Sequence, residues 1–390
     1  MKKIFFATRV RGFFKHLFSN EKMEYEIINN YNGFYELNSS KRKIIAKIAK
    51  LSLFDLLGVI QVIRCKNKEG DINGSFNRFL DSDKPYFIYL ENPTALYHYK
   101  LGRRKSILGK KRISKYLSNK NLKAIVCMSQ ACYNTFDDVC GSREKKDDMK
   151  KVIYPLVPRN NLVSKESIHK RVGKTEIHLL FIAQGIRFLS KGGLEVIEAF
   201  KRLRADGRDV TLTMVTSIKD VDANLINLIR EMENIKLLDF TLSYEQMEEL
   251  YAESTILLQP TSDESFGLTI LEGIKAGLPV LATRLYAIPE MVNDGINGYL
   301  TDPQWWFFDK NNIPNPKVWN YREETLYSGK IDDKIIQFLY EKIIHLDDNR
   351  DTLKQMSLNS LKIGNSDSFN EENIISAWNN LFNSLSDNVN

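Results

Sequence analysis

The sequence predicts an α/β protein with two Rossmann-like domains, each built on a doubly wound parallel sheet. Three observations favour this class. The chain has 390 residues, which suits two domains of ordinary size better than a single core. In both halves, short apolar runs alternate with segments of helical periodicity, the order that produces parallel sheets. Polar, glycine-containing loops follow several of these runs, as at the ligand-binding edge of nucleotide-binding domains.

The first half begins with the strand run KKIFFATRV at residues 2–10. A helical region is expected over residues 41–63, running from a basic part to an apolar part. Two further strand runs, PYFIYLENP at 85–93 and LKAIVCMS at 122–129, each end in a polar turn. The stretch 159–176 is polar and has no apolar periodicity, so we expect it to be the interdomain linker.

The second half shows the alternation more clearly. Ile177–Ala183 is an unbroken apolar run typical of a buried strand. Ser243 and Gln246 form a capping box, flanked by Leu242 and Met247, which predicts the start of a helix. Further strands are expected at 209–216, 256–260 and 279–283, and further helices at 191–207 and 268–276.

These elements predict an N-terminal domain over residues 1–160 and a C-terminal domain over residues 174–367. The last segment, about 368–390, has the pattern of an amphipathic helix, and we expect it to pack back on the N-terminal domain. An aromatic stretch at 302–325 contains Pro and Asn without periodicity, so it is interpreted as an insertion. A local packing element is the favoured reading of this insertion, and a binding face is the alternative.

The composition indicates a globular protein, with 43% apolar and 11% aromatic residues. No segment approaches the roughly 18 to 20 uncharged apolar residues of a membrane span. The apolar N-terminal run is interrupted at Arg9 and Arg11 and no small-residue cleavage site follows, so we expect no signal peptide and a cytoplasmic location. The cysteines form neither a CxxC pair nor a metal-site spacing, and we expect reduced, buried thiols at Cys65, Cys127, Cys132 and Cys140.

The net charge of +7 is unevenly distributed. Residues 1–150 contain 30 Lys and Arg against 15 Asp and Glu, whereas the remaining residues contain 26 against 34. Basic clusters lie at Lys41–Lys43, Arg103–Lys105 and Lys110–Arg112. An N-terminal half with this excess of basic residues can attract an anionic membrane surface, a lipid diphosphate or nucleic acid. Nucleic acid is disfavoured because no aromatic platform is interleaved with the charges.

The stretch ESFGLTILEGIKAGLPV, residues 264–280, combines a glycine turn with two carboxylates. The backbone amides of Phe266, Gly267 and Leu268 fall at the expected helix start, where unpaired N–H groups and the helix dipole attract an anion such as a diphosphate. Glu264 precedes the turn and Glu272 lies in the helix. A nucleotide sugar carries hydroxyls at both ends and a diphosphate between them, which matches this order. Two solvated surface carboxylates are the alternative.

Residues 235–300 resemble the donor-binding signature of the retaining glycosyltransferases of family 4 (group 1). These proteins have the GT-B fold, in which two Rossmann-like domains face a central cleft. The resemblance implies that Glu272 holds the ribose hydroxyls, Glu264 holds the hydroxyls of the donor sugar, and Phe266 to Leu268 bind the diphosphate and sugar. The matching positions are Glu264, Phe266, Gly267, Glu272, Gly277, Pro279, Val280, Pro289, Glu290, Gly295 and Gly298.

A second stretch, FIAQGIRFLSKGGLEVIEAF at 181–200, is similar to the family's loop in which a basic pair binds the donor diphosphate. Lys191 matches the family's lysine, and Arg187 is the candidate arginine in a loop that departs from the common G-R-L form. Gly185 opens this loop and is assigned to donor binding. No Asp-x-Asp motif lies in the donor loop, so we expect no obligatory metal, and a UDP- or GDP-sugar is the expected donor substrate.

In many relatives a histidine of the acceptor domain lies near the reaction centre. The comparable strand end here reads YLENPTALYHY, and Glu91 or Asn92 stands where that histidine would be, with His98 nearby. Glu91 is therefore a candidate catalytic residue, and a carboxylate that caps the strand end is the alternative. His16, after the first strand, has no better claim.

The resemblance implies a hexosyltransferase-type enzyme that moves a sugar to an acceptor hydroxyl with retention of configuration, with the donor bound by residues 174–367 and the acceptor by residues 1–160. The expected acceptor is a saccharide or a lipid-linked saccharide in bacterial surface polysaccharide or glycolipid assembly. The basic half favours peripheral contact with the inner face of the cell membrane. A nucleotide-sugar epimerase of the same fold and a non-catalytic partner subunit with a donor fold are the alternatives.

Overall fold

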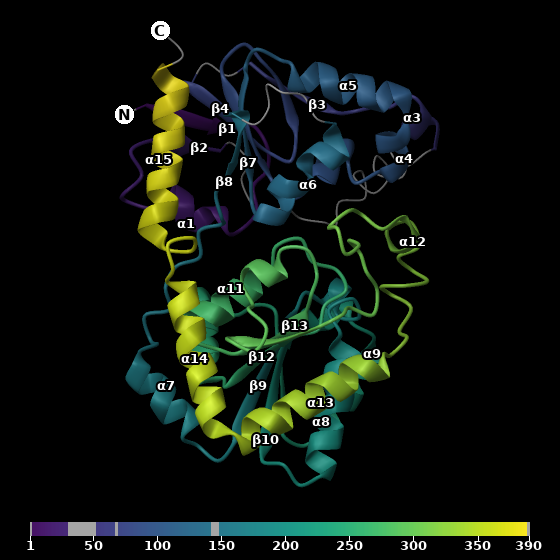
Figure 1. Cartoon of the computed structure of the whole chain (residues 1–390), viewed down its shortest axis with the longest axis vertical. Helices are drawn as coiled ribbons and strands as arrows, with labels where there is room; N and C mark the ends of the chain where they lie inside the picture. Colours follow the sequence, from purple (N-terminus) through teal and green to yellow (C-terminus); the bar gives the residue numbers. More distant parts are fainter. Residues whose placement is uncertain (1, 30–51, 67–68, 142–147, 388–390) are drawn as a thin grey trace. The chain divides into compact units, whose positions relative to one another are not determined.

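A computed structural model describes residues 2–29, 52–66, 69–141 and 148–387 of the chain (Figure 1). The chain divides into two compact units. Unit 1 comprises Met1–Val157, Asn311–Pro314 and Ser368–Asn390, and unit 2 comprises Pro158–Lys310 and Asn315–Asp367. The C-terminal segment therefore belongs to the same unit as the N-terminal half.

A six-stranded sheet forms the centre of unit 1, in the order β2-β1-β4-β6-β7-β8. All neighbouring strands in it run parallel. The central strands β4 and β6 are buried along their whole length, as expected for a parallel sheet covered on both faces. The strands are β1 (Lys3–Phe6), β2 (Glu26–Ile28), β4 (Ile72–Phe76), β6 (Tyr86–Leu90), β7 (Leu122–Cys127) and β8 (Lys150–Val152), while β3 (Val62–Cys65) and β5 (Phe79–Ser82) form a separate pair.

Helices cover the unit 1 sheet, and aromatic contacts attach the C-terminal helix α15 (Glu371–Asp387) to it. The indole ring of Trp378 lies 5.6 Å from the Phe87 ring and 5.2 Å from the Tyr89 ring, both on β6. Burial of these rings contributes a large share of the apolar core. The other helices are α1 (Phe14–Phe18), α3 (Ser52–Leu56), η1 (Pro93–Tyr97), α4 (Leu101–Lys105), α5 (Ile107–Leu117) and α6 (Gln130–Cys140).

Unit 2 is built on a second parallel sheet, in the order β11-β10-β9-β12-β13-β14. The direction in which the chain adds strands reverses between β9 and β12. Loops after these two strands therefore lead to opposite faces and leave a crevice at the carboxyl edge, the usual ligand site of such sheets. The strands are β9 (Ile177–Ala183), β10 (Val210–Thr216), β11 (Ile235–Asp239), β12 (Ile256–Gln259), β13 (Val280–Thr283) and β14 (Gly298–Thr301).

The linker expected at residues 159–176 is wrong in part, because it contains helix α7 (Lys165–Val172), capped by Ser164 and belonging to unit 2. Arg171 attaches this helix by donating hydrogen bonds to the carbonyls of Ala252, Ala276 and Gly277. The other helices of the unit are η3 (Gly185–Arg187), α8 (Gly193–Ala205), η4 (Ile218–Asp220), α9 (Ala223–Glu231), α10 (Tyr244–Glu253), α11 (Leu268–Lys275), η5 (Ile288–Glu290), α12 (Pro316–Trp319), α13 (Asp333–Asp348) and α14 (Arg350–Gly364).

The aromatic insertion at 302–325 is held by stacked rings. Phe307 stacks on Trp319 with centroids 4.1 Å apart, and Phe308 stacks on Tyr286 at the same separation. The guanidinium of Arg322 lies over the rings of Phe307 and Trp319. Most of this stretch therefore packs locally, the reading favoured from the sequence.

The predicted fold class is confirmed, and the strands expected in the second half lie where their apolar runs lie. The helix expected over residues 41–63 is wrong at its end, because Val62 and Ile63 belong to strand β3; residues 41–51, which include the Lys41–Lys43 cluster, lie outside the described residues. All four cysteines lie in the described ranges, are buried and form no disulfide there, as expected. In the described ranges, no helix combines the length and apolar character needed to cross a bilayer.

Candidate active site

Two loops of unit 2 meet at the crevice between β9 and β12. The loop after β9 covers residues 184–192 and the loop after β12 covers residues 260–267. The backbone N–H of Ser262 donates to the carbonyl of Ser190 at 2.8 Å, and the hydroxyl of Thr261 donates to the same carbonyl at 3.4 Å. These bonds fix the two loops relative to each other, so residues from both face one site.

Glycines are required at two positions of these loops. Gly192 has φ +81°, and a Cβ there would lie 2.7 Å from the carbonyl oxygen of Pro260. Gly267 has φ +99° and caps helix α11. L-residues with side chains rarely adopt these left-handed conformations, so the glycines permit both the loop contact and the sharp turn into the helix.

The N-terminus of α11 presents backbone donors to the site. The amides of Gly267 and Leu268 have no acceptor in the part of the chain that the structure describes. They lie at the positive end of the helix dipole, which favours an anion. The Phe266 amide was expected to be available to an anion as well, but it donates at 3.3 Å to Oε1 of Glu264. The Phe266 side chain is buried in the core.

Lys191 and Glu264 form the centre of the site. The Lys191 ammonium lies 2.5 Å from Oε2 of Glu264 and donates to the carbonyl of Asp263 at 2.9 Å. Its side chain is 9% exposed and that of Glu264 is 21% exposed. An ammonium has three N–H donors, so these two bonds leave one for a further acceptor. The sequence analysis assigned both residues to one site, and the structure places them in contact although they are 73 positions apart.

The charge state of Glu264 follows from its surroundings. Burial by itself would raise the pKa of this carboxyl, but the Lys191 ammonium and the nearby Arg187 guanidinium bring the pKa down to about 2. The backbone N–H of Ser265 also donates to its Oε1 at 2.9 Å. Glu264 is therefore ionised at neutral pH and keeps lone pairs that can accept hydrogen bonds from hydroxyls.

Arg187 reaches the site from the η3 turn. Its Nε lies 3.9 Å from Oδ2 of Asp263, which is a loose ion pair, and its side chain is 38% exposed. Asp263 is buried, and its Oδ2 has no hydrogen-bond partner among the described residues. A half-exposed guanidinium beside a buried carboxylate can turn toward an incoming anion without leaving its partner.

Glu272 lies one and a half turns into α11 and is held by a residue that the sequence analysis missed. The phenol of Tyr251, on α10, donates to Oε2 of Glu272 at 2.7 Å. Burial raises the pKa of Glu272 above its usual value, and this hydrogen bond opposes part of the rise. Tyr251 thus orients the carboxylate. Its sequence signal, an aromatic residue on the buried face of α10, is shared by many core tyrosines.

Gly185 has a packing role whatever else it does. A Cβ at this position would lie 2.2 Å from the carbonyl oxygen of Ser217, which follows strand β10. The absence of a side chain therefore lets the loop after β9 rest on the loop after β10. Direct contact of Gly185 with a donor remains a prediction.

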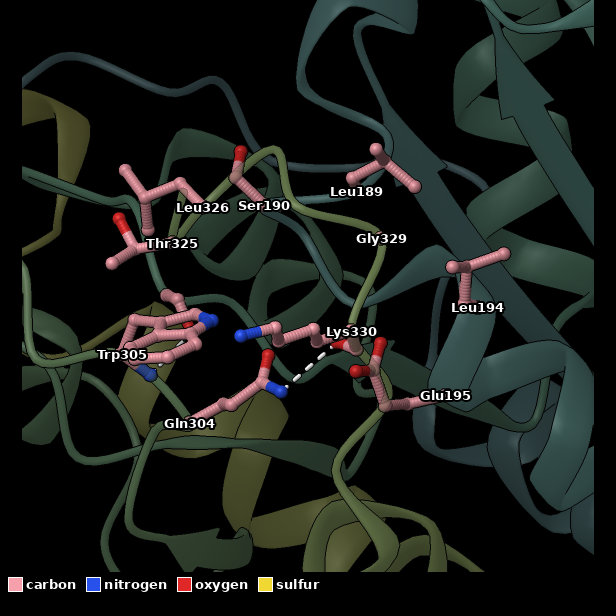
Figure 2. Close-up of a pocket in the computed structure, with 11 residues that line it drawn as sticks. Leu189, Ser190, Leu194, Glu195, Gln304, Trp305, Thr325, Leu326, Gly329 and Lys330 are labelled. Carbon is pink, nitrogen blue, oxygen red and sulfur yellow. Dashed lines mark hydrogen bonds between the residues drawn. The ribbon is translucent and has the colours of Figure 1, made fainter. Parts of the chain in front are cut away.

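The insertion borders this site. The Trp305 amide donates to the Ser262 hydroxyl at 3.1 Å, and Gln304 donates to the Lys330 carbonyl at 2.9 Å. Figure 2 shows the indole N–H of Trp305 and the ammonium of Lys330 pointing toward one another across a small pocket that Ser190 also lines. The insertion therefore touches both loops of the crevice, a position that its sequence did not indicate.

Glu91 lies in unit 1, at the carboxyl end of β6, in a cluster of its own. Its side chain is 5% exposed and lies 3.0 Å from the guanidinium of Arg11. The Tyr99 phenol donates to its Oε1, and its backbone N–H donates to Oδ1 of Asn77 at 3.0 Å. Asn77 and Tyr99 have φ near +60°, as does His98. Non-glycine residues held in this left-handed backbone conformation store strain, and such strain is frequent at functional sites.

His98 does not suit the role of a base. Its Nε2 accepts a hydrogen bond of 2.8 Å from the backbone N–H of Gln61. Burial, together with the Arg78 and Arg103 guanidiniums, lowers its pKa to about 3, so the ring is neutral and its acceptor nitrogen is occupied. Burial also lowers the pKa of His16.

A metal centre has no obvious ligand set in the described ranges, where no three His, Cys, Asp or Glu side chains form a group suited to an ion. The expectation that the reaction needs no metal stays a prediction.

Comparison with known families identifies this region. Residues 164–306 match the model of the family described as Glycosyl transferases group 1. The match covers less than half of the chain and lies within unit 2. The matched range contains both loops of the crevice, and this similarity to group 1 glycosyltransferases supports the predicted glycosyltransferase class.

Two curated relatives extend this result. A protein of Klebsiella pneumoniae described as "Uncharacterized 41.2 kDa protein in cps region" is 26% identical over 52% of this chain and 54% of its own length. The N-acetyl-alpha-D-glucosaminyl L-malate synthase of Bacillus anthracis is 30% identical over 24% of this chain and 28% of its own length. The chain thus spans about half or less of the length of these curated relatives.

Solved structures resemble the whole chain. The structure of Anabaena HepE in complex with UDP-glucose has a TM-score of 0.62 and 16% identity, covering 98% of this chain and 100% of that chain. A glycosyltransferase from Rickettsia africae has a TM-score of 0.60 and 16% identity, covering 98% of each. At these identities the likeness shows the fold, and the predicted GT-B class is confirmed.

Proposed function

We propose that the protein is a retaining glycosyltransferase that moves a sugar from a nucleotide-diphosphate sugar to an acceptor hydroxyl. The observation that carries the proposal is the ion pair of Lys191 and Glu264 beside the N-terminus of α11, inside the group 1 domain. One unused ammonium N–H and the unpaired amides of Gly267 and Leu268 form a donor set for a diphosphate.

The donor would be held along α11. The diphosphate would lie against Lys191, Arg187 and the Gly267 and Leu268 amides. Glu264 would accept hydrogen bonds from the hydroxyls of the sugar, and Glu272, oriented by Tyr251, from those of the ribose. The HepE structure contains UDP-glucose, which supports a UDP-sugar as donor, and a GDP-sugar is the second candidate.

The proposed reaction depends mainly on stabilising the negative charge of the leaving diphosphate. The bond from the anomeric carbon to the diphosphate oxygen breaks, the acceptor oxygen bonds to that carbon, and the acceptor hydroxyl loses its proton. Negative charge grows on the leaving diphosphate, where the Lys191 ammonium and the α11 amides are already oriented. Such preorganised donors lower the barrier because they need no rearrangement during the reaction.

Unit 1 would bind the acceptor. Its strand-end cluster around Glu91 is the candidate for contact with the acceptor hydroxyl. The Klebsiella relative lies in a cps region, which supports a role in surface polysaccharide or glycolipid assembly. The basic N-terminal half, with 30 Lys and Arg against 15 Asp and Glu, supports a cytoplasmic protein that associates peripherally with an anionic membrane surface and takes a saccharide or lipid-linked saccharide.

A thermal-shift panel of UDP, GDP, ADP, dTDP and CMP tests the donor site. We expect one nucleoside diphosphate, at about a hundred times its Kd, to stabilise the protein by roughly 2.7 kcal/mol, and the stabilisation to fall to about half or less in Glu272→Ala. EDTA should leave both the shift and subsequent sugar transfer unchanged. A panel with no shift would favour a non-catalytic partner, and conversion of the donor without an acceptor would favour an epimerase.

A further inference from the structure

A group of exposed apolar side chains lies on unit 1, away from the strand-end residues described above. Leu53 and Leu56 on α3 are 58% and 70% exposed, and Leu57 follows at 41%. Ile107 and Leu108, in the first turn of α5, are 79% and 46% exposed. Large apolar residues exposed singly are common, but a group of them indicates a contact surface.

The two segments adjoin in space. The Ser106 hydroxyl donates to the carbonyl of Leu56 at 2.7 Å, and Arg112 donates to the carbonyl of Gly58 at 3.3 Å. The backbones of Gly58 and Gly109 touch so closely that a Cβ on Gly58 would lie 2.2 Å from the Gly109 nitrogen. Helices α3, α4 and α5 pack on one another (Figure 1). The five apolar residues therefore form one surface, here named the α3–α5 patch.

The inward face of α5 does not need these residues. Gly109, Ile113 and Leu117, spaced four apart, are buried and attach the helix to unit 1. Ile107 shares the opposite face with Lys110 and Lys111, three and four positions along. Helix α5 thus has an apolar inner face that packs on unit 1. Its outer face carries exposed isoleucine and leucine side chains next to lysines.

The charge around the patch is mainly positive. Residues 98–123 contain ten Lys and Arg and no Asp or Glu. Lys105, Lys110, Lys111 and Lys115 are exposed. The acidic residue of α3, Asp55, is paired with the buried Arg103 at 3.0 Å, so its charge is neutralised locally.

We propose that the α3–α5 patch docks on the surface of an anionic phospholipid membrane. The leucine and isoleucine side chains enter the acyl boundary, and the lysines pair with lipid phosphates while their aliphatic stems lie along the interface. This inference rests on the membrane association proposed above and names the surface that makes it, and it does not depend on sugar transfer.

The charge also argues against a second copy of the chain as occupant. Lysine is depleted at the cores of protein interfaces because its desolvation is costly. Two identical patches facing each other would place lysines of like charge in contact. An anionic bilayer instead satisfies the lysines and the apolar residues at once.

Cosedimentation of the full chain with lipid vesicles tests the proposal. Wild type should bind vesicles of phosphatidylcholine and phosphatidylglycerol in a 7:3 ratio at low salt, and bind pure phosphatidylcholine far less. The double variant Leu56→Ser/Ile107→Ser should lose at least about ten-fold in partitioning. Lys110→Gln/Lys111→Gln should lose roughly five-fold for each lysine, with the loss disappearing at high salt.

Matched controls come from unit 2. Leu228→Ser, at a leucine that is 50% exposed on α9, and Lys317→Gln/Lys334→Gln, at two exposed lysines, should bind vesicles as wild type does. Failure of wild type to bind anionic vesicles, or equal binding by the patch variants, would overturn the proposal. A dimer in sedimentation velocity that Leu56→Ser/Ile107→Ser dissociates would assign the patch to a second copy.

The nucleotide thermal shift separates this inference from the proposed reaction. Patch variants that lose vesicle binding should keep the nucleotide shift of wild type, which also shows that they are folded. Vesicle binding without any nucleotide shift would leave the patch standing and remove the donor site.

Discussion

The strand ends of the two parallel sheets carry different kinds of site. In unit 2, Glu264, Gly267, Leu268 and Glu272 come from one stretch of nine residues, and Lys191 joins them through a second loop. In unit 1, Glu91 is surrounded by residues from separate segments, namely Arg11, Asn77 and Tyr99.

The difference shows what a sequence pattern can reveal. A helix N-terminus with its turn and flanking carboxylates is a local object, so its chemistry is visible in consecutive residues. A buried carboxylate whose partners lie far apart in the chain depends on tertiary folding, and its surroundings become visible only in the structure. Substitutions at Lys191 and Glu272 in unit 2 and at Glu91 in unit 1 can show whether residues at both strand ends contribute to one reaction.

The largest expected effect is that of Lys191→Ala. It removes the ammonium that would stabilise the leaving diphosphate, and it leaves the carboxylate of Glu264 without its cation. We expect turnover to fall by about 10² to 10³ and the protein to be less stable. Enzyme assays and thermal melts of the variant measure both effects. Lys201→Ala, at an exposed lysine on α8, the helix that follows the Lys191 loop, is the control and should change neither.

The pH dependence of the same pair has a defined sign. The folded pKa of Glu264, about 2, lies below the usual value near 4.5, so its contribution to stability is present above pH 4.5 and is lost as pH falls through the folded pKa. The stability of wild type should therefore be unaffected by this group from pH 5 to 8 and should fall below pH 4.5. Lys191→Ala should lack this acid-side fall, because burial of Glu264 is then no longer opposed by the ammonium. The same fall below pH 4.5 in wild type and in the variant would contradict the ion pair.

A smaller effect is expected at Glu272, at the ribose end of the proposed donor site. Glu272→Ala should weaken nucleotide binding by about 10- to 100-fold, the cost of hydrogen bonds to a charged group. Titration calorimetry measures this loss, and Glu253→Ala, at an exposed glutamate on α10, is the control. Tyr251→Phe should show a weaker loss in the same direction.

Acid should reproduce part of that loss in wild type. Burial raises the pKa of Glu272, so protonation begins above the usual range for a glutamate. UDP-glucose affinity should fall as pH is lowered toward this pKa, and Glu272→Gln should flatten the profile. A raised carboxyl pKa favours the folded state as pH falls, so unfolding through this group does not account for the change.

The sequence predicted the parts of the molecule whose stability is local. Ile177–Ala183 is an unbroken apolar run and forms β9 with those bounds, and Ser243 and Gln246 form the expected capping box. Helix α7 was missed because its polar sequence gives little periodicity; it is held by Arg171, whose guanidinium donates to carbonyls at the end of α11 and to Ala252.

Some contacts of the candidate site could not be predicted from the sequence for the same reason, because they join residues that are far apart in the chain. Tyr251 reaches Glu272 from another helix, and neither residue's neighbours in sequence show the contact. The burial of Asp263 beside Arg187 likewise depends on how two loops fold together. The sequence therefore predicts candidate ligand-facing groups of unit 2 but not the residues that orient them.

Glu91→Gln tests whether the unit 1 cluster takes part in catalysis. The amide keeps the shape of the side chain and removes the charge that faces Arg11. We expect turnover to fall about ten-fold, the effect of one charge-assisted hydrogen bond, while nucleotide affinity stays at the wild-type value. Steady-state assays with saturating donor, together with nucleotide titrations, measure the two quantities.

The outcome for Glu91 distinguishes the two readings of that residue. A lower melting temperature with unchanged turnover of the folded variant would show that the carboxylate only holds the strand end in place. Arg11→Gln serves as the reciprocal variant. A purely structural ion pair predicts the larger loss of stability from Arg11→Gln, because it leaves the buried Glu91 carboxylate without its cation, whereas the half-exposed Arg11 can be solvated.

The smallest expected effect lies where the insertion meets the donor loops. Ser262→Ala removes the hydroxyl that accepts a hydrogen bond from the Trp305 amide, leaving this donor without its partner at a buried loop. We expect a loss of about 1 kcal/mol, seen as a fall of roughly 2 to 4 °C in Tm, with nucleotide affinity within about two-fold of wild type. Ser366→Ala, at an exposed serine, is the control. A loss of nucleotide affinity well beyond two-fold would mean that the insertion positions the loop after β12. The candidate site of unit 2 would then depend, as the Glu91 cluster does, on a contact between segments that are far apart in the chain.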